Sequence, residues 1–143
     1  MNYKLVSATE NEIDLLIKYK LASIFDYAYN LDENETNKIK EYINNTVPEE
    51  LNDYKLIKIN DEIVGCLLIE PYEDGVLLNE IYLTNDYRGK GIGTDILNDI
   101  LSNNEIVYLW AYKNNVRAIK LYKKLGFNVI EETDTRVFMK YEN

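Results

Sequence analysis

The sequence predicts an α/β (α+β) fold, with a mixed, mostly antiparallel central sheet and helices on both faces. Three observations favour this fold class. Apolar periodicity gives the element order β-α-α-β-β-β-α-β-α-β-β. Two apolar runs flank Asn60-Asp61, a short hairpin signal. Three glycines, Gly89, Gly91 and Gly93, join a strand-like run directly to a helical pattern. With 143 residues, the chain is long enough for one domain, residues 1–143, and for a sizeable core.

Each strand is predicted from a short apolar or alternating run. The expected strands are residues 2–6, 54–59, 62–69, 76–83, 106–112, 127–130 and 135–141. Gly75 separates the hairpin from the strand that ends at Leu83.

Four helices connect these strands. They are expected at residues 13–21, 32–48, 92–101 and 115–125. Thr9, followed three residues later by Glu12, is a capping-box signature for the first helix. Gly126 stands where the last helix needs a left-handed C-cap.

The stretch Arg88-Gly89-Lys90-Gly91-Ile92-Gly93-Thr94 indicates an anion site. Glycines at alternate positions let the backbone approach a ligand closely and take positive φ without a Cβ penalty. The N–H groups of the following helix then point at that ligand with the favourable end of the helix dipole. A pyrophosphate suits this arrangement. A Walker loop does not fit, because the one lysine lies between glycines, and Thr94 stands where a Rossmann turn needs its third glycine.

Two blocks of sequence stand on either side of the strand at residues 106–112. The first is Arg-x-x-Gly-x-Gly, from Arg88 to Gly93, and the second runs from Asn115 to Phe127 as Asn-x-x-Ala-hydrophobic-x-hydrophobic-Tyr-x-x-x-Gly-Phe. Together they resemble the GNAT family, the Gcn5-related N-acetyltransferases, over residues 78–129. The resemblance implies a GNAT-like fold, in which the sheet splays near its middle to admit the cofactor, and it implies acetyl-CoA as the acetyl donor.

The resemblance also assigns residues to the coenzyme. Backbone N–H groups of the glycine loop would hold the pyrophosphate, although as pure structure the loop would be only a tight strand-to-helix turn. Backbone atoms at the end of the preceding strand would bind the pantetheine arm. Asn115 would either contact the coenzyme or serve only as a helix N-cap. The candidate cofactor-binding residues are Leu83, Asn85, Arg88, Gly89, Lys90, Gly91, Ile92, Gly93, Thr94 and Asn115.

Basic residues recur along the helix that follows Asn115. Arg117, Lys120 and Lys124 form one helical stripe, with Lys113 just before it. Facing the 3′-phosphate of the coenzyme, they would form an anion-binding rim. The alternative is an ordinary solvated helix face.

Two residues are candidates for catalytic proton transfer. Tyr122 falls where the family often places a tyrosine beside the acetyl-CoA sulfur, so its phenol would protonate the departing thiolate. The alternative for Tyr122 is a core tyrosine. Glu80 lies on the strand that leads into the glycine loop, and its carboxylate could accept the amine proton directly or through water. The alternative for Glu80 is a solvent-facing strand residue, and the matching position on the neighbouring strand is Trp110, which cannot act as a base.

Composition restricts the available chemistry. The chain has no histidine, so a proton transfer must use a carboxylate, a tyrosine, a backbone group or water. The one cysteine, Cys66, lies in an apolar strand and is interpreted as a core residue. One cysteine and no histidine also predict that the chain has no metal site.

These features predict an enzyme, an acetyl-CoA-dependent N-acetyltransferase that moves the acetyl group directly to a primary amine. The net charge is −9, and residues 1–75 carry 16 acidic and 7 basic side chains, whereas residues 76–143 carry 9 of each. We expect the acceptor over the acidic half, near the first two helices and residues 25–29, where carboxylates are interleaved with aromatics. A cationic small molecule such as a polyamine or an aminoglycoside suits this surface. A protein lysine or N-terminus, and a non-catalytic acetyl-CoA sensor, are the alternatives.

The sequence also limits the partners. An acidic surface disfavours nucleic acid. No apolar run approaches the roughly 20 residues that span a bilayer, and the N-terminus does not resemble a signal peptide, so a cytoplasmic protein without a membrane partner is expected. The family resemblance allows a homodimer that pairs through the strand at residues 135–141.

Overall fold

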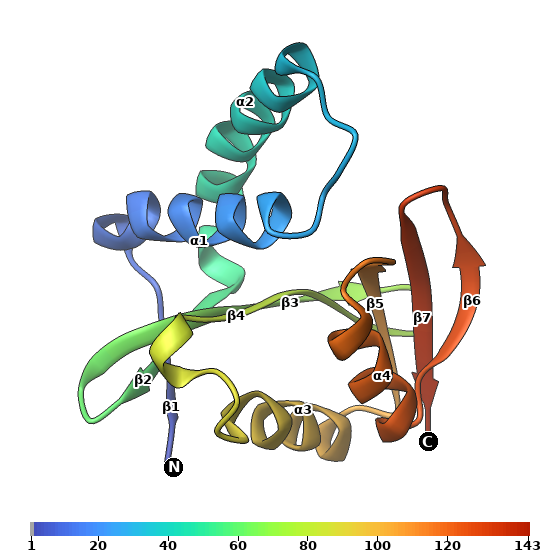
Figure 1. Cartoon of the computed structure of the whole chain (residues 1–143). Coiled ribbons are helices and arrows are strands. Elements are labelled where there is room, and N and C mark those ends of the chain that lie inside the picture. The colour runs from blue at the N-terminus through green and yellow to red at the C-terminus, as the bar shows by residue number, and fades with distance from the viewer. Residues whose placement is uncertain (1) are drawn as a thin grey trace.

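Among residues 2–143, which the computed structural model describes, seven strands and four helices follow the predicted order (Figure 1). The strands are β1 (Lys4–Ser7), β2 (Tyr54–Ile59), β3 (Glu62–Tyr72), β4 (Gly75–Leu83), β5 (Ile106–Tyr112), β6 (Asn128–Glu132) and β7 (Arg136–Glu142). The helices are α1 (Ile13–Phe25), α2 (Glu33–Glu49), α3 (Ile92–Asn103) and α4 (Val116–Leu125). Short 3₁₀ turns are η1 (Glu10–Glu12), η2 (Leu51–Asp53) and η3 (Asn85–Tyr87).

The strands form one sheet in the order β1-β2-β3-β4-β5-β7-β6. Neighbouring strands are antiparallel except β4 and β5. That parallel pair is in register only at Val76↔Val107 and Leu77↔Tyr108, near the start of each strand. The predicted mixed, mostly antiparallel sheet is therefore confirmed, and the expected splay lies between β4 and β5.

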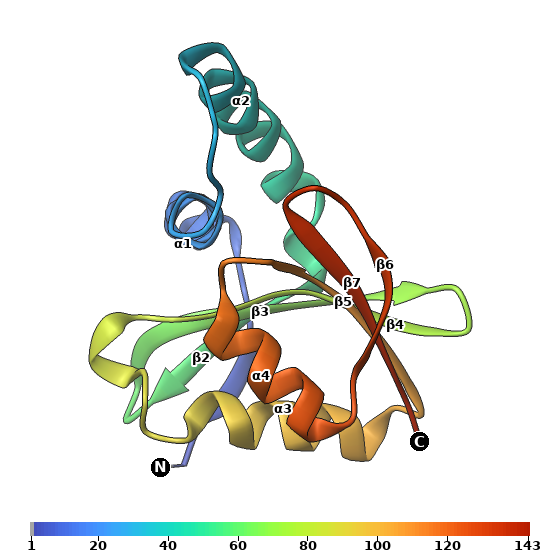
Figure 2. The same cartoon turned by 45° about the vertical axis from the view of Figure 1, so that its right-hand side comes forward.

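Helices cover both faces of the sheet, as predicted. α1 and α2 lie on one face, and α3 and α4 lie on the other (Figures 1 and 2). Within residues 2–143, no helix combines the length and the apolar character needed to cross a membrane.

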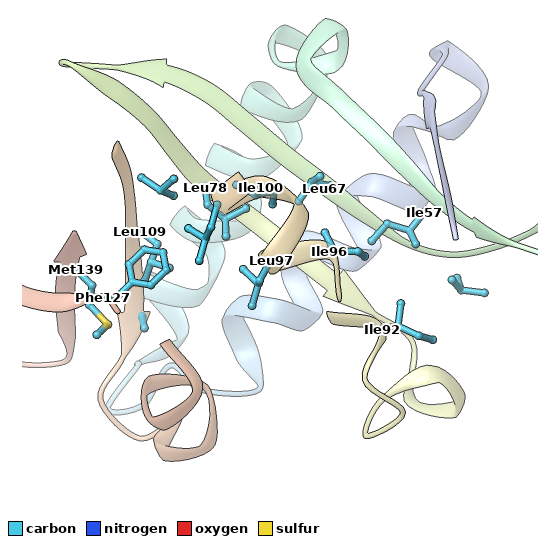
Figure 3. Close-up of a cluster of buried hydrophobic side chains, with 14 of the residues drawn as sticks. Ile57, Leu67, Leu78, Ile92, Ile96, Leu97, Ile100, Leu109, Phe127 and Met139 are labelled. Carbon is cyan, nitrogen blue, oxygen red and sulfur yellow. The ribbon is translucent and has the colours of Figure 1, made fainter. Parts of the chain in front are cut away.

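Each face of the sheet has its own hydrophobic core. The larger cluster fills the space beside α3, where Ile96 and Ile100 pack with Leu67 and Leu78 (Figure 3). All four side chains are buried. The periodic apolar residues that predicted α3 thus lie on the face of the helix that packs against the sheet.

The smaller cluster lies against α1 and α2. Leu16 and Tyr19 of α1 pack there with Tyr54, Cys66 and other side chains of β2 and β3. Cys66 is fully buried, which confirms its interpretation as a core residue. This second core holds α1 above the strand that leads to the glycine loop.

Local sequence signals explain several element ends. Thr9 and Glu12 form the predicted capping box, and Asp32 forms a second one at the start of α2. Gly126 ends α4 with φ of 109°, in the left-handed region. The hairpin residues Asn60 and Asp61 both have positive φ, 51° and 64°, as a tight two-residue hairpin turn requires.

Some boundaries differ from the predicted ones. β1 begins at Lys4 rather than at residue 2, and β6 and β7 each begin and end one or two residues later than expected. β3 extends to Tyr72, because Glu70 and Pro71 still pair with β4 before the turn. α2 continues through Pro48 to Glu49, and the Glu50 N–H still donates to the Thr46 carbonyl oxygen at 3.0 Å.

The backbones of β3 and β4 lie close together at Gly65. A Cβ atom at this position would lie 1.9 Å from the carbonyl oxygen of Tyr82. The clash is with backbone, so rotation of a side chain cannot relieve it.

We expect Gly65→Ala to lower the free energy of unfolding by about 3 kcal/mol, because β4 must move away from β3. Gly93→Ala is the matched control, since its Cβ would meet only Leu83 Cδ1 at 3.8 Å. Alanine also favours the helix, so this control should keep the stability or raise it by up to about 1 kcal/mol. Denaturant unfolding measures both variants, and equal stabilities would contradict the prediction.

Candidate active site

One cleft of about 1280 Å³ runs through the split between β4 and β5. At one end it is lined by the glycine loop and the start of α4, and at the other by α1, α2 and the segment between them. A site for one small ligand typically has roughly 300–1,000 Å³. This cleft therefore has room for more than one small ligand.

The glycine loop turns the chain sharply from η3 into α3. Gly89 and Gly91 have φ of 72° and 84°, which side-chain-bearing residues rarely adopt. Gly91 is the N-cap of α3 and has no side chain, so the N–H groups of the first helical turn point outward at the cleft. The arrangement suits a phosphate group at the positive end of the helix dipole.

Gly93 differs from the other two glycines. The sequence suggested positive φ at all three, but Gly93 lies inside the first turn of α3 and is not in the left-handed region. Only Leu83 Cδ1, at 3.8 Å, would lie near a Cβ atom there. Gly93 thus keeps the cleft open instead of permitting the turn.

The candidate cofactor residues divide into two groups. Those that line the cleft are Leu83, Arg88, Gly89, Gly91, Gly93, Thr94 and Asn115. Asn85, Lys90 and Ile92 lie outside it. The Lys90 ammonium lies over the Tyr87 ring, 5.7 Å from its centroid, and Ile92 is buried in the core. Ile92 therefore has only its backbone groups to offer a ligand.

Arg88 and Arg117 both line the cleft, and the Arg117 guanidinium lies at its loop end. Arg88 Nε donates to the Leu83 carbonyl oxygen at 2.7 Å, and its guanidinium lies over the Tyr82 ring. The Arg117 guanidinium reaches within 3.7 Å of the position a Cβ would take on Gly89. Lys120 and Lys124 are exposed and lie outside the cleft, so of the predicted basic stripe only Arg117 faces it.

Asn115 is both an N-cap and a cleft residue. Its Oδ1 accepts a hydrogen bond from the Ala118 N–H at 3.3 Å. It also lines the cleft beside Arg117. The capping role is therefore present, and contact with a ligand remains a prediction.

Glu80 is buried with 5% of its surface exposed, so it is not the solvent-facing strand residue that the sequence left open. Its Oε1 accepts from the Tyr54 hydroxyl at 2.7 Å, and its Oε2 accepts from the Cys66 thiol at 3.3 Å. The Lys20 ammonium lies 3.6 Å from Oε1. Burial raises the pKa of Tyr54 and the pKa of Cys66, and the nearby Glu80 carboxylate adds to both shifts. Both groups therefore stay protonated and donate to Glu80.

A second group of polar residues surrounds Lys20, beyond Glu80. Lys20 Nζ donates to Asn79 Oδ1 at 3.0 Å, and the Asn79 amide donates to the carboxylates of Glu50 and Glu70. Burial, and next the Glu70 carboxylate, raise the pKa of Glu50 to about 7, while the Lys20 ammonium acts in the opposite direction. No motif in the sequence pointed to Lys20, although its position on the helical period of α1 placed it on the inner face.

Tyr122 lines the cleft from α4. Its ring packs against Phe127 with centroids 5.7 Å apart. Burial, and next the nearby Tyr27, raise the pKa of Tyr122 to about 12. The phenol is therefore protonated at neutral pH, as a proton donor requires. Tyr27 belongs to the segment between α1 and α2, and the sequence did not predict that Tyr27 lies near Tyr122.

The segment between α1 and α2 closes over the far end of the cleft. Tyr27 and Tyr29 line it, and the Tyr29 hydroxyl donates to the backbone oxygen of Asp134 between β6 and β7 at 3.4 Å. Arg136 lies over the Trp110 ring, 4.6 Å from its centroid. Residues 26–29 thus border the end of the cleft where the sequence placed the acceptor.

This fold is that of the N-acetyltransferase class. A PaiA N-acetyltransferase from Thermoplasma acidophilum, solved in complex with coenzyme A, matches with a TM-score of 0.74 and covers 100% of both chains at 17% identity. The family model for the acetyltransferase (GNAT) domain matches residues 52–129, more than half of the chain. The chain therefore belongs to the GNAT acetyltransferase family.

Two curated relatives match over shorter stretches. An uncharacterized N-acetyltransferase from Methanocaldococcus jannaschii is 40% identical over 55 residues, which are 35% of this chain and 24% of the relative. A spermine/spermidine N(1)-acetyltransferase from Bacillus subtilis is 31% identical over 65 residues, which are 41% of this chain and 43% of the relative. The chain thus spans less than half the length of each of these relatives.

We expect Arg117→Ala to weaken binding of coenzyme A about 10-fold, because a charge-assisted contact to phosphate is worth about 1.5 kcal/mol. Lys120→Ala is the matched control on the same helix and should change the Kd less than about 2-fold, as exposed charges do. Isothermal titration calorimetry at physiological salt measures both. Equal losses in the two variants would contradict the placement of the phosphates at Arg117.

Proposed function

We propose that this chain transfers an acetyl group from acetyl-CoA to a primary amine of a cationic small molecule, such as a polyamine or an aminoglycoside. One observation carries the proposal. A single cleft connects the glycine loop and Arg117 with the Tyr122 phenol and the buried Glu80 carboxylate. The same cleft thus offers an anion site, a proton donor and a proton acceptor.

The glycine loop and the split in the sheet suit a coenzyme. The first-turn N–H groups of α3, with Arg88 and Arg117, would hold the phosphates. Beyond their two paired positions, β4 and β5 leave backbone groups along the cleft that can hydrogen-bond an extended amide-containing arm. When bound there, acetyl-CoA would supply the activated acetyl group. The chain's own contribution is to position the reactants and to exclude water.

Two side chains would move protons. The Tyr122 phenol would protonate the leaving thiolate, since its raised pKa keeps it in the acid form. Glu80 would receive the proton of the attacking amine, directly or through one water. Its hydrogen bonds from Tyr54 and Cys66 hold the carboxylate in place on the α1 side of the sheet.

The charge and aromatic character of the far end of the cleft favour a cationic acceptor. Its lining includes four carboxylates beside the cations Lys20, Arg88 and Arg136. The carboxylates are Asp26, Glu35, Glu80 and Asp134. Tyr27, Tyr29 and Tyr42 add aromatic faces that attract ammonium groups. The spermine/spermidine acetyltransferase of Bacillus subtilis, which matches in part, agrees with this acceptor class.

The decisive experiment measures CoA release from acetyl-CoA with polyamines, aminoglycosides, amino acids and basic peptides. Turnover confined to polyamines or aminoglycosides, with a KM that rises with salt, would support the proposal. Turnover confined to basic peptides would replace the small-molecule acceptor with a protein. No turnover, with acetyl-CoA still raising the Tm, would favour a non-catalytic sensor. No thermal shift would refute the acetyl-CoA assignment itself.

We expect Tyr122→Phe to lower kcat about 100-fold and to leave the KM for acetyl-CoA unchanged, because only the proton-donating hydroxyl is lost. The remaining ring still packs against Phe127. Tyr141→Phe is the matched control, since Tyr141 packs on the same ring at 5.7 Å but lies outside the cleft. Steady-state kinetics measure both variants. A kcat for Tyr122→Phe within twofold of the unchanged chain would rule out this role.

A further inference from the structure

Among residues 2–143, Lys20 is the one lysine whose side chain lines the cleft. It extends from α1, and only 13% of its side chain is exposed. Its Nζ lies 3.6 Å from Glu80 Oε1 and donates to Asn79 Oδ1 at 3.0 Å. A primary amine of the chain itself is therefore held inside the candidate active site.

The position of this amine matches what an acceptor requires. A general base acts on a nitrogen within about 2.6–3.2 Å, or through one water. Lys20 Nζ is only slightly farther than this from the carboxylate that we propose as the base. An acceptor nitrogen that gives its proton directly to Glu80 Oε1 would occupy nearly the same place as Lys20 Nζ.

We propose that Lys20 is itself an acetyl acceptor, so that the chain acetylates its own Lys20 Nζ when acetyl-CoA is bound and no free amine is present. This inference rests on the proposed function. Glu80 takes one proton from the Nζ ammonium, the neutral nitrogen attacks the thioester carbonyl, an N–C bond forms and the C–S bond breaks. The departing thiolate takes its proton from Tyr122, the acylated nitrogen gives its second proton back to the Tyr122 phenolate through water, and Glu80 releases its proton to solvent, so the products are N-acetyl-lysine, coenzyme A and one proton.

Tethering favours this reaction over modification of the other lysines. A nitrogen that the fold holds beside its base reacts at an effective concentration far above that of a free amine. Lysines outside the cleft lie away from the proposed thioester site, even where a carboxylate is near, as Glu132 is to Lys113 at 3.6 Å and Glu142 is to Lys140 at 3.8 Å. Lys18, two residues away on α1, is exposed and lies outside the cleft.

Acetylation would change the site. The modified side chain loses its positive charge and its ion pair with Glu80, and the added acetyl group fills the space beside the carboxylate. An amine acceptor bound at Glu80 would compete with Lys20. A true acceptor should therefore slow the acetylation of Lys20. The rate of this modification then indicates whether an acceptor occupies the site.

The test incubates the full chain with acetyl-CoA alone and maps acetylated peptides by mass spectrometry over time. We expect acetylation at Lys20 to be at least about 10-fold faster than at Lys18, and Glu80→Gln to slow it at Lys20 only. Lys20→Arg keeps the positive charge and should abolish the fast phase, whereas Lys18→Arg should not. Equal rates at Lys20 and Lys18, or a rate at Lys20 that does not respond to Glu80→Gln, would overturn the inference.

Two further measurements separate this inference from the proposed function. If a free amine is acetylated but Lys20 stays unmodified without acceptor, self-acetylation is wrong and the transferase remains. If acetyl-CoA neither raises the Tm nor supports any turnover, both are wrong. If the amine that is acetylated slows acetylation of Lys20, and amines that are not substrates do not, the result would support both the proposed function and self-acetylation.

Discussion

The short parallel contact between β4 and β5 is the constraint on which the site depends. These strands share only two paired positions, at Val76↔Val107 and Leu77↔Tyr108. A sheet that stayed paired to the ends of both strands would close the cleft and satisfy all its backbone groups internally. Because the two strands separate early, a cleft between them runs from the glycine loop to α1. Backbone donors and acceptors of both strands are left along this cleft.

Each face of the sheet then has to be stabilised separately. The core beside α3 holds the glycine loop, and the core beneath α1 holds Glu80. A buried carboxylate is costly unless it is hydrogen-bonded and paired. Tyr54, Cys66 and Lys20 meet that requirement from two strands and a helix. The same contacts that offset the cost of burying the Glu80 carboxylate also hold it at the cleft.

Local signals predicted most of the fold, and non-local register explains what they missed. The capping residues, the Asn60-Asp61 turn and Gly126 act within a few residues, so the sequence shows them directly. The partners of Glu80 come from α1, β2 and β3, at least 14 residues away along the chain, and no spacing rule reveals them. A sequence motif identifies positions along the chain, but it does not show where each side chain points. Ile92 therefore matched the loop pattern although its side chain lies in the core.

Charge divides the cleft into two ends. The Arg117 guanidinium lies at the loop end, where anionic phosphates suit it, and the far end includes the carboxylates of Asp26, Glu35, Glu80 and Asp134. Lys20 is consistent with this division, because Glu80 and, through Asn79, Glu50 and Glu70 surround its ammonium. The chain thus stabilises a primary ammonium group of its own at the end where we propose that the acceptor binds. A free amine with a similar shape would meet the same carboxylates, and it would have to displace Lys20 to reach Glu80.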